Sequence, residues 1–364
     1  MSVVFRVDAS NEIGTGHLTR CLALAEVIRK KGQEVVFVMR SLPGHLTDAI
    51  VKLGFKVCPL PWIQGQPYGG RDHAGWLGVS WEQDAEECAT LLSSLKPDWL
   101  IVDHYALDAR WEIRVHSLVP RLMVIDDLAD RPHDCDILLD QNLAENSHSR
   151  YQTLTPKSAI QLLGPSFALL RSEFADLRQK GISVRGSPIR RVVISFGGID
   201  LSDATSLCLH ALRELTESHL SIDVIVGAGN PHHAEVERLC QSMPNARFFR
   251  QPSNMAELFL QADVGIGASG STTWERCCLG LPSILIALAK NQEVVGEGCR
   301  QADMAVYLGA FDQVGRRDIR AAVDKLNEGD RLAELSRKCA AMIDGLGTLR
   351  VQEALISCRR PVLS

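Results

Sequence analysis

The chain has 364 residues, a formal net charge of −5 and 46% hydrophobic residues. This length exceeds what one hydrophobic core usually organises, so two domains are expected, with a single large barrel as the alternative. The average composition excludes a disordered or fibrous protein, and the charge provides no basic field for nucleic acid, so any anionic ligand must be held by local features.

The cysteines and the first residues indicate the compartment. Eleven cysteines are scattered without a C-x-x-C motif, which is typical of buried reduced thiols and not of a disulfide framework. The start of the chain lacks the pattern of a signal peptide, and no window approaches the roughly 18 apolar residues of a membrane-spanning helix. We therefore expect a cytoplasmic protein without membrane or nucleic-acid partners, and a monomer by default.

The predicted strands are short apolar runs, rich in β-branched residues, that alternate with helical patterns. This alternation is typical of βαβ units on buried parallel sheets, and it predicts an α/β fold. The runs are Val3–Val7, Val35–Val38, Trp99–Val102, Leu122–Ile125, Val192–Ser195, Ile222–Val226, Val264–Gly267 and Ser283–Ala287.

A glycine turn follows the first predicted strand and leads into a helix that ends near Gly32. Free backbone N–H groups at Gly14 and Gly16 attract an anion or a lone pair at such a turn. Because Thr19 replaces the third glycine of the dinucleotide fingerprint and the second strand ends at Arg40 instead of an acidic residue, a nicotinamide cofactor is disfavoured.

His17 occupies the first turn of this predicted helix. The partial positive charge there disfavours imidazolium, so the ring is expected to stay neutral and to accept a proton from water near neutral pH. The alternative is a polar residue tolerated at an exposed helix start.

An irregular stretch, Pro59–Ser80, carries Trp62, Trp76 and several glycines. It is either a lid over a ligand or an ordinary surface loop. Further along, the Asp103-His-Tyr105 and Asp126-Asp127 segments place polar side chains at strand ends, where α/β sheets bind ligands.

A hard-metal site at Asp126, Asp127 and Asp130 is an alternative use of these aspartates, but aspartates at strand ends more often cap helices or fix turns, so no metal is expected. The dipeptide His232-His233 has no third zinc ligand spaced near it, and we interpret it as a loop or a helix start.

The irregular stretch Gly164–Pro188 separates the two runs of strands. It predicts an N-terminal domain over residues 1–175 and a C-terminal domain over 185–345, followed by a helical tail over 346–364. Each domain opens with a strand and a glycine turn, at Gly14–Gly16 and at Gly197–Gly198. Ligands bind at the carboxyl ends of such strands, so two facing domains would enclose a substrate in a cleft.

A second glycine turn, from Gly267 to Glu275, again follows a strand and begins a helix. Its small residues allow backbone amides to approach a diphosphate, and Glu275 can accept both ribose hydroxyls. The alternative is a capping box, in which Thr272 and Glu275 satisfy the helix without a ligand. No Walker A motif occurs, which disfavours ATP-driven phosphoryl transfer.

Taken together, these motifs resemble the family of UDP-2,4-diacetamido-2,4,6-trideoxy-β-L-altropyranose hydrolases of pseudaminic acid biosynthesis, a branch of the GT-B superfamily related to the peptidoglycan N-acetylglucosamine transferase. The resemblance extends to about Gln301 and is specific through the combination of motifs. The motifs are Arg6–Ser10, Ile13–His17 with Arg20, Asp103–Tyr105, Asp126-Asp127, His133–Asp140, Gly164–Arg171, Ser195–Gly198, Ser269–Glu275 and Lys290–Glu293.

This resemblance implies two Rossmann-like domains with parallel sheets facing a central cleft, the sugar on the N-terminal side and UDP on the C-terminal side. His17 would deprotonate the water that attacks the anomeric carbon, with inversion and loss of UDP, and without a cofactor or metal. The implied substrate-binding residues are Gly14, Gly16, Arg20, Tyr105 and Asn291, with Tyr105 near the sugar and Asn291 near the diphosphate. The implied nucleotide-binding residues are Gly197, Gly198, Ser269, Gly270, Ser271, Thr272, Glu275 and Gln292.

The chemistry of the leaving group agrees with this interpretation. Ordinary glycosidases use a second carboxyl group to protonate an alkoxide, whereas UDP is already a stable anion. Two rivals remain at this point, a GT-B glycosyltransferase that uses an acceptor hydroxyl and a non-catalytic sugar-nucleotide sensor.

Overall fold

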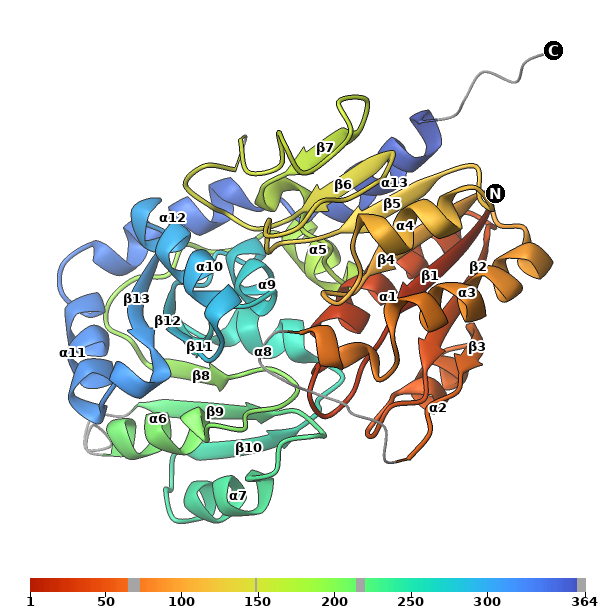
Figure 1. The fold of residues 1–364 in the computed structure, drawn as a ribbon. Helices are drawn as coiled ribbons and strands as arrows, with labels where there is room; N and C mark the ends of the chain where they lie inside the picture. Colours follow the sequence, from red (N-terminus) through yellow and green to blue (C-terminus); the bar gives the residue numbers. More distant parts are fainter. Residues whose placement is uncertain (65–72, 148, 214–219, 359–364) are drawn as a thin grey trace. The chain divides into compact units, whose positions relative to one another are not determined.

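The computed structural model describes residues 1–64, 73–147, 149–213 and 220–358, which form two compact units (Figure 1). Unit 1 comprises Met1–Asn142, Asn146–Leu169 and the chain from Gly347 onward. Unit 2 comprises Leu143–Glu145 and Leu170–Leu346. The chain therefore enters unit 2 from unit 1 and later returns to unit 1.

Unit 1 is built on a seven-stranded parallel sheet of order β3-β2-β1-β4-β5-β6-β7. Its strands are β1 (Ser2–Val7), β2 (Glu34–Arg40), β3 (Lys56–Leu60), β4 (Trp99–Asp103), β5 (Leu122–Ile125), β6 (Ile137–Asp140) and β7 (Ile160–Leu163). Its helices are α1 (Gly16–Lys30), α2 (Thr47–Lys52), η1 (Ala74–Leu77), α3 (Trp81–Leu95), α4 (Ala109–His116), η2 (Pro165–Phe167) and α13 (Gly347–Ser357).

Unit 2 is built on a six-stranded parallel sheet of order β10-β9-β8-β11-β12-β13. Its strands are β8 (Arg191–Ser195), β9 (Ser221–Val226), β10 (Ala246–Arg250), β11 (Val264–Ala268), β12 (Ser283–Ala287) and β13 (Ala305–Ala310). Its helices are α5 (Ser172–Gln179), α6 (Ala204–Arg213), α7 (His233–Gln241), α8 (Met255–Gln261), α9 (Thr272–Cys278), α10 (Lys290–Gln301), η3 (Phe311–Gln313), α11 (Arg316–Leu326) and α12 (Arg331–Met342).

Both faces of the sheet in unit 1 are covered, which explains why its central strands are apolar without alternation. On one face Phe5 of β1 packs in a cluster with Leu24 of α1. On the other face Val4 packs in a cluster with Leu92 of α3 and with Trp111 of α4. The two-sided burial leaves the ends of the strands as the places where polar groups collect.

The structure confirms the α/β fold and all eight predicted strands, which are β1, β2, β4, β5, β8, β9, β11 and β12. The first helix begins at Gly16 and ends just before Gly32, near the end that was predicted, and Gly32 has φ +73°, a conformation that favours glycine. The sequence did not predict β3, β6, β7, β10 and β13.

The region that the sequence set apart as a tail, residues 346–364, contains α13. This helix packs against α1 in unit 1, although one is coloured dark blue and the other red in Figure 1. Val351 and Leu355 of α13 are fully buried in the same cluster as Phe5. No helix within the described part of the chain is both long and apolar enough to cross a membrane.

Candidate functional site

The candidate site of unit 1 lies where the strand order reverses. After β1 the chain continues to β2 and β3 on one side, whereas β4 and the later strands extend on the other side of β1. Ligands of open α/β sheets bind at the carboxyl ends of the strands at such a point. His17 lies at the start of α1, just after β1, and Asp103 is the last residue of β4.

The turn before His17 includes a glycine in a left-handed backbone conformation. Gly14 has φ +77° and donates its N–H to the carbonyl of Ser10 at 2.9 Å. Because L side chains rarely adopt this conformation, the turn requires glycine at position 14. The helix then begins at Gly16 and places His17 in its first turn, as the sequence predicted.

His17 and Asp103 form a buried pair. His17 Nδ1 lies 2.6 Å from Asp103 Oδ1, and only 8% of the histidine is exposed. Since an ionised carboxylate only accepts hydrogen bonds, Nδ1 carries the proton and donates it to Asp103. Nε2 then holds the ring's lone pair, so this tautomer presents a base at the atom that faces away from Asp103.

Arg20 keeps Asp103 charged. Its Nε and Nη2 each donate to one oxygen of the Asp103 carboxylate at 2.7 Å. Burial by itself raises the pKa of Asp103, but the charge of Arg20 and the contact with His17 outweigh it and hold the pKa well below its usual range. The carboxylate therefore stays ionised and fixes the orientation of the imidazole.

Tyr105 lies beside this pair and is held by Asp127. Its hydroxyl donates to Asp127 Oδ1 at 2.5 Å, and Arg20 Nη1 donates to Asp127 Oδ2 at 2.9 Å. The Tyr105 ring meets the His17 ring edge-on, with centroids 4.4 Å apart and an interplanar angle of 84°. Asn142 Nδ2 completes the shell around Asp127 at 3.1 Å.

An aromatic pair from the Pro59–Ser80 stretch packs onto the same group. Trp76 stacks on Tyr105 with centroids 5.7 Å apart, and its ring lies 6.5 Å from that of His17. His73 lies against both Trp76 and Tyr105, at 4.4 and 4.9 Å. The part of this stretch at residues 65–72 lies outside the described residues, so the choice between a lid and a surface loop stays a prediction.

Sequence reasoning did not assign Asp127, Asn142 or His73 to this site. The sequence placed Asp127 at a strand end that suits a ligand site and considered it as a metal ligand, but gave it no role beside His17, and no pattern marked the other two. The one available signal was positional, because Asp127 follows β5 at the same edge of the sheet as Asp103.

The other aspartates of this edge have protein partners. Asp126 accepts hydrogen bonds from Tyr151 at 2.9 Å and from the Ala129 N–H at 2.9 Å, and Arg131 pairs with both Asp126 and Asp130. Within the described ranges, no group of three His, Cys, Asp or Glu side chains is arranged to hold a metal ion. These contacts agree with a structural use of Asp126 and Asp130.

In unit 2 the strand order reverses between β8 and β11, and both glycine turns follow these strands. Gly197 has φ +86°, and a Cβ at Gly227 would lie 2.2 Å from the Gly198 carbonyl, so the turns after β8 and β9 approach backbone to backbone. This tight approach leaves the Gly197–Gly198 turn beside the carboxyl ends of the central strands.

The turn after β11 is tied to the start of α10. Ser269 donates its hydroxyl to the Gln292 carbonyl at 2.9 Å, and the Gln292 amide nitrogen lies 3.9 Å from where a Gly270 Cβ would be. Gln292 Oε1 in turn accepts the Leu288 N–H at 2.9 Å. The structure thus brings Ser269, Gly270 and Gln292 together, with Asn291 adjacent in the first turn of α10.

Glu275 is not used as a capping residue. The α9 helix begins at Thr272 with Ser271 as its N-cap, and no side-chain cap bond forms there among the described residues. Glu275 Oε1 instead accepts from Arg171 Nε at 3.0 Å. The capping-box alternative is therefore wrong, because Thr272 lies one residue too far into the helix. His232 and His233, by contrast, begin α7, which confirms their interpretation as a helix start.

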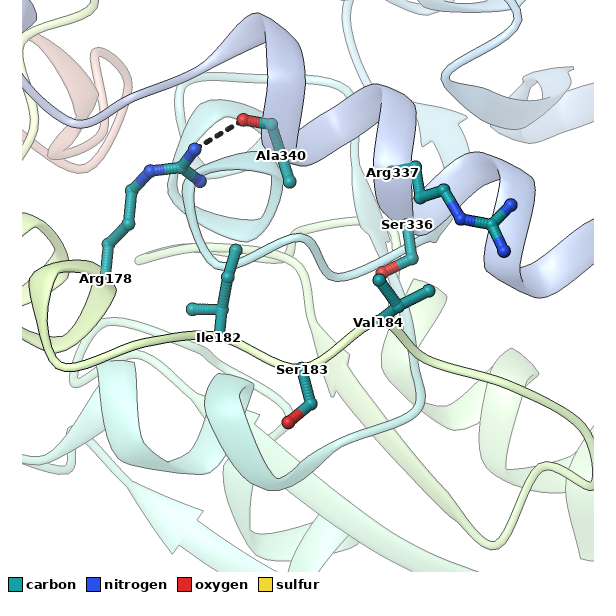
Figure 2. A pocket seen from close by; sticks show the side chains of 7 residues that line it. All are labelled: Arg178, Ile182, Ser183, Val184, Ser336, Arg337 and Ala340. Atoms are coloured by element: carbon teal, nitrogen blue, oxygen red, sulfur yellow. Dashed lines mark hydrogen bonds between the residues drawn. The ribbon is translucent and has the colours of Figure 1, made fainter.

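A separate cavity of about 270 Å³ lies elsewhere in unit 2 (Figure 2). Figure 2 shows Arg178 at one end, where it donates to the Ala340 carbonyl, and Arg337 extending away from it. Ile182, Ser183, Val184 and Ser336 complete the lining. None of the predicted site residues lines this cavity.

The C-terminal part of the chain matches a known domain family. Residues 192–305, which lie within unit 2, match the glycosyltransferase family 28 C-terminal domain. This stretch runs from β8 to the start of β13 and includes both glycine turns.

Named relatives extend the similarity beyond this domain. The UDP-2,4-diacetamido-2,4,6-trideoxy-beta-L-altropyranose hydrolase of Campylobacter jejuni is 28% identical over 80% of this chain and 94% of its own length. The spore coat polysaccharide biosynthesis protein SpsG of Bacillus subtilis is 23% identical over 53% of this chain and 57% of its own. The first match confirms the resemblance that the sequence motifs predicted.

Solved glycosyltransferase structures share the fold. MurG of Acinetobacter baumannii superposes with a TM-score of 0.66 at 12% identity, over 98% of this chain and 99% of its own. UGT2 of Phytolacca americana, complexed with UDP-2fluoro-glucose and pterostilbene, gives a TM-score of 0.70 at 12% identity over the same shares. The predicted GT-B class, with two parallel-sheet α/β units, is thereby confirmed.

Proposed function

We propose that this chain, which has the GT-B fold and resembles a UDP-sugar hydrolase, hydrolyses UDP-2,4-diacetamido-2,4,6-trideoxy-β-L-altropyranose to UDP and the free sugar in pseudaminic acid biosynthesis. The observation that carries the proposal is the buried His17–Asp103 pair at the switch point of unit 1. We include in the proposal a cytoplasmic monomer that needs no metal.

In the proposed reaction, His17 Nε2 removes a proton from water while the water oxygen forms a bond to the anomeric carbon. The bond from that carbon to the diphosphate oxygen breaks, and its electron pair leaves with UDP. Attack from the face opposite the leaving group inverts the anomeric centre. Asp103 stabilises the imidazolium that forms at His17, because its own charge is held by Arg20.

The proposal assigns the aromatic group to the sugar side. The Tyr105 hydroxyl is already bonded to Asp127, so Tyr105 is proposed to contact the sugar through its ring. Gly16 is proposed to offer its backbone N–H group to the substrate, and Gly14, whose own N–H is bonded to the Ser10 carbonyl, to give the substrate-binding turn its shape. Arg20 is proposed to act by fixing Asp103.

Unit 2 is proposed to bind the nucleotide. Gly197, Gly198 and the Gly270–Thr272 segment are proposed to offer backbone N–H groups near the carboxyl ends of β8 and β11. Ser269, whose own N–H is bonded to the Ile286 carbonyl, holds this segment to Gln292 through its hydroxyl, and Asn291 and Gln292 are proposed to join the site from α10. Glu275 uses Oε1 for Arg171 and keeps Oε2 as the acceptor for the ribose hydroxyls. Electrostatic support of this kind suits a leaving group that departs as an anion.

The second candidate function is a glycosyltransferase that passes the sugar to an acceptor hydroxyl. The match of residues 192–305 to a glycosyltransferase domain favours it. Both functions use the same nucleotide site, so only the nature of the acceptor separates them.

The test is to incubate the purified protein with the UDP-sugar in ¹⁸O-labelled water, without an acceptor and with EDTA. The proposal expects UDP release over many turnovers, label in the sugar and not in UDP, and an inverted anomer by NMR. Release only after an acceptor is added supports the transferase. Binding without turnover under any of these conditions supports a sensor.

The matched variants are His17→Asn and His210→Asn. Asparagine at position 17 keeps a donor near the place of Nδ1 but removes Nε2, so turnover should fall by about a thousandfold or more while UDP affinity stays unchanged. His210 lies on α6 in unit 2 and should tolerate the same change. Equal turnover in the His17→Asn variant would exclude the proposed base.

A further inference from the structure

Arg276 is a fully buried arginine directly after the predicted ribose ligand. It lies on α9 with 1% of its surface exposed. Side chains on a helix point back toward its N-terminal end, and the guanidinium accordingly reaches the preceding turn. Its Nη2 donates to the Ala268 carbonyl at 2.9 Å and contacts Thr273 Oγ1 at 3.2 Å. The positive charge therefore lies beneath the turn that joins β11 to α9.

The glycines of β11 provide the space for this side chain. A Cβ at Gly265 would lie 2.8 Å from Arg276 Cδ, and a Cβ at Gly267 would lie 2.5 Å from Nη1. Two glycines in a central strand weaken it unless they make room for another group. The alternate glycines of the Val264–Ala268 strand thus keep a cation against the sheet.

The charge of Arg276 has no carboxylate partner in the described part of unit 2. Its Nε and Nη1 form no hydrogen bond there, and the neighbouring Glu275 pairs with Arg171. Burial lowers the pKa of Arg276, because removing the charged guanidinium from water costs free energy that no carboxylate partner among the described residues offsets.

The nearby thiols do not supply the missing charge. A hydrogen bond that the Cys277 thiol donates to Cys339 and burial both raise the pKa of Cys277, and burial raises that of Cys299, so both stay neutral near pH 7. An anion that binds from outside the protein remains as the source of the compensating charge.

A second buried polar atom without a hydrogen-bond partner in the described part of the chain, the Ser195 hydroxyl oxygen, lies next to Gly267 in the sheet. Ser195 pairs with Gly267 across β8 and β11, and its hydroxyl is buried without a partner. Val192 and Ile194 face the cluster that also contains Ile266, so by alternation Ser195 and Gly267 face the opposite side, where Arg276 lies. Uncompensated polar groups therefore gather at the switch point of unit 2.

We propose that Arg276 is a positioning residue for nucleotide binding, whose buried charge acts through the β11–α9 turn to stabilise the diphosphate. This inference rests on the proposed function only in taking a nucleoside diphosphate as the ligand. It holds equally for a hydrolase, a transferase or a sensor.

The test compares the affinities of UDP and uridine for the full chain by calorimetry, for the wild type, Arg276→Met and Arg276→Lys. Methionine fills a similar volume without charge, and its UDP affinity should fall about tenfold to a hundredfold while uridine affinity stays within about twofold. Lysine restores the charge and should recover most of the UDP affinity. If the methionine variant does not fold, Arg276→Gln takes its place in the same comparison.

Arg185→Met is the matched control, because Arg185 is also a buried arginine of unit 2 that donates to backbone carbonyls, including that of Ala262. It should lower stability without changing the ratio of UDP to uridine affinity. An unchanged ratio in the neutral Arg276 variants, or an equal loss of both affinities, would overturn the inference alone. A wild-type protein that binds neither ligand would overturn the proposed function as well.

Discussion

Asp103 is the residue through which the rest of unit 1 acts on His17. It accepts two hydrogen bonds from Arg20 and one from the imidazole, and it is completely buried. The sequence predicted His17 from its place in a glycine turn and through the family resemblance. It did not predict the partner, because the two residues are 86 positions apart and only the pairing of β1 with β4 brings them together.

The Asp103→Asn variant should lose most of its turnover. An amide that donates to the ring selects the tautomer with the proton on Nε2, which is then no longer a base, so kcat should fall by about 10²- to 10⁴-fold. UDP affinity should not change. Steady-state kinetics and calorimetry measure both quantities, with the exposed Asp48→Asn on α2 as the control. A kcat equal to that of the wild type would show that Asp103 does not orient the base.

His133 should make the stability of the protein depend on pH. Burial lowers its pKa, but the Asp126 carboxylate 3.8 Å from Nε2 and the hydrogen bond between Nδ1 and Glu112 outweigh this and raise the pKa to about 9 from an ordinary value of 6.5. Because folding raises this pKa, protonated His133 stabilises the folded protein. This contribution to the free energy of unfolding is fully present below about pH 6.5 and is lost as the pH rises through 9.

Denaturant unfolding of the wild type and His133→Gln across this range measures the contribution. The difference in the free energy of unfolding should be largest near pH 6 and shrink by about 3 kcal/mol toward pH 10. His116, whose pKa is also raised to about 9 but which is more exposed, should give a smaller change in the same direction. A difference that does not vary with pH would contradict the charged pairing of His133.

At the scale of elements, the buried central strands were predictable and the edge strands were not. Val3–Val7 and Val192–Ser195 are apolar along their whole length because helices cover both faces of the sheet. β3, β7, β10 and β13 lie at sheet edges, where most of their residues are only partly buried or are exposed, and this weakens their apolar pattern. β6 is fully buried, but only its first three residues, Ile137–Leu139, are apolar, and a run this short between aspartates does not stand out as a strand.

Helix α13 should contribute to the stability of unit 1. Leu355 is fully buried in the cluster around α1, whereas Ile356 beside it is 37% exposed. Leu355→Ala should cost about 2–5 kcal/mol of the free energy of unfolding, and Ile356→Ala about 0.5 kcal/mol or less.

Tryptophan fluorescence during urea unfolding measures the predicted loss of stability in unit 1. Five of the six tryptophans, Trp62, Trp76, Trp81, Trp99 and Trp111, lie in unit 1, so their transition should move to lower urea in Leu355→Ala. An unchanged transition would mean that the packing of α13 contributes nothing to unit 1.

At the scale of the whole molecule, the sequence predicted the number of units and their class, since length and the two runs of strands indicate them directly. The glycine turns of unit 2 were also placed correctly at the ends of β8 and β11. The pairing of Glu275 with Arg171 was not predictable, because a capping motif and a ligand site use the same spacing. Contacts between distant side chains depend on the assembled sheet, which local patterns do not contain.

The return of the chain to unit 1 has a consequence for how the protein is made. The ribosome releases Gly347–Ser357 only after the whole of Leu170–Leu346 has been synthesised. The apolar surface of α1 that Val351 and Leu355 cover thus stays uncovered throughout that time, while Leu170–Leu346, which forms nearly all of unit 2, can already fold. Vectorial synthesis therefore favours the maturation of the downstream unit first, and a nascent chain stalled before residue 347 would present a binding surface to chaperones.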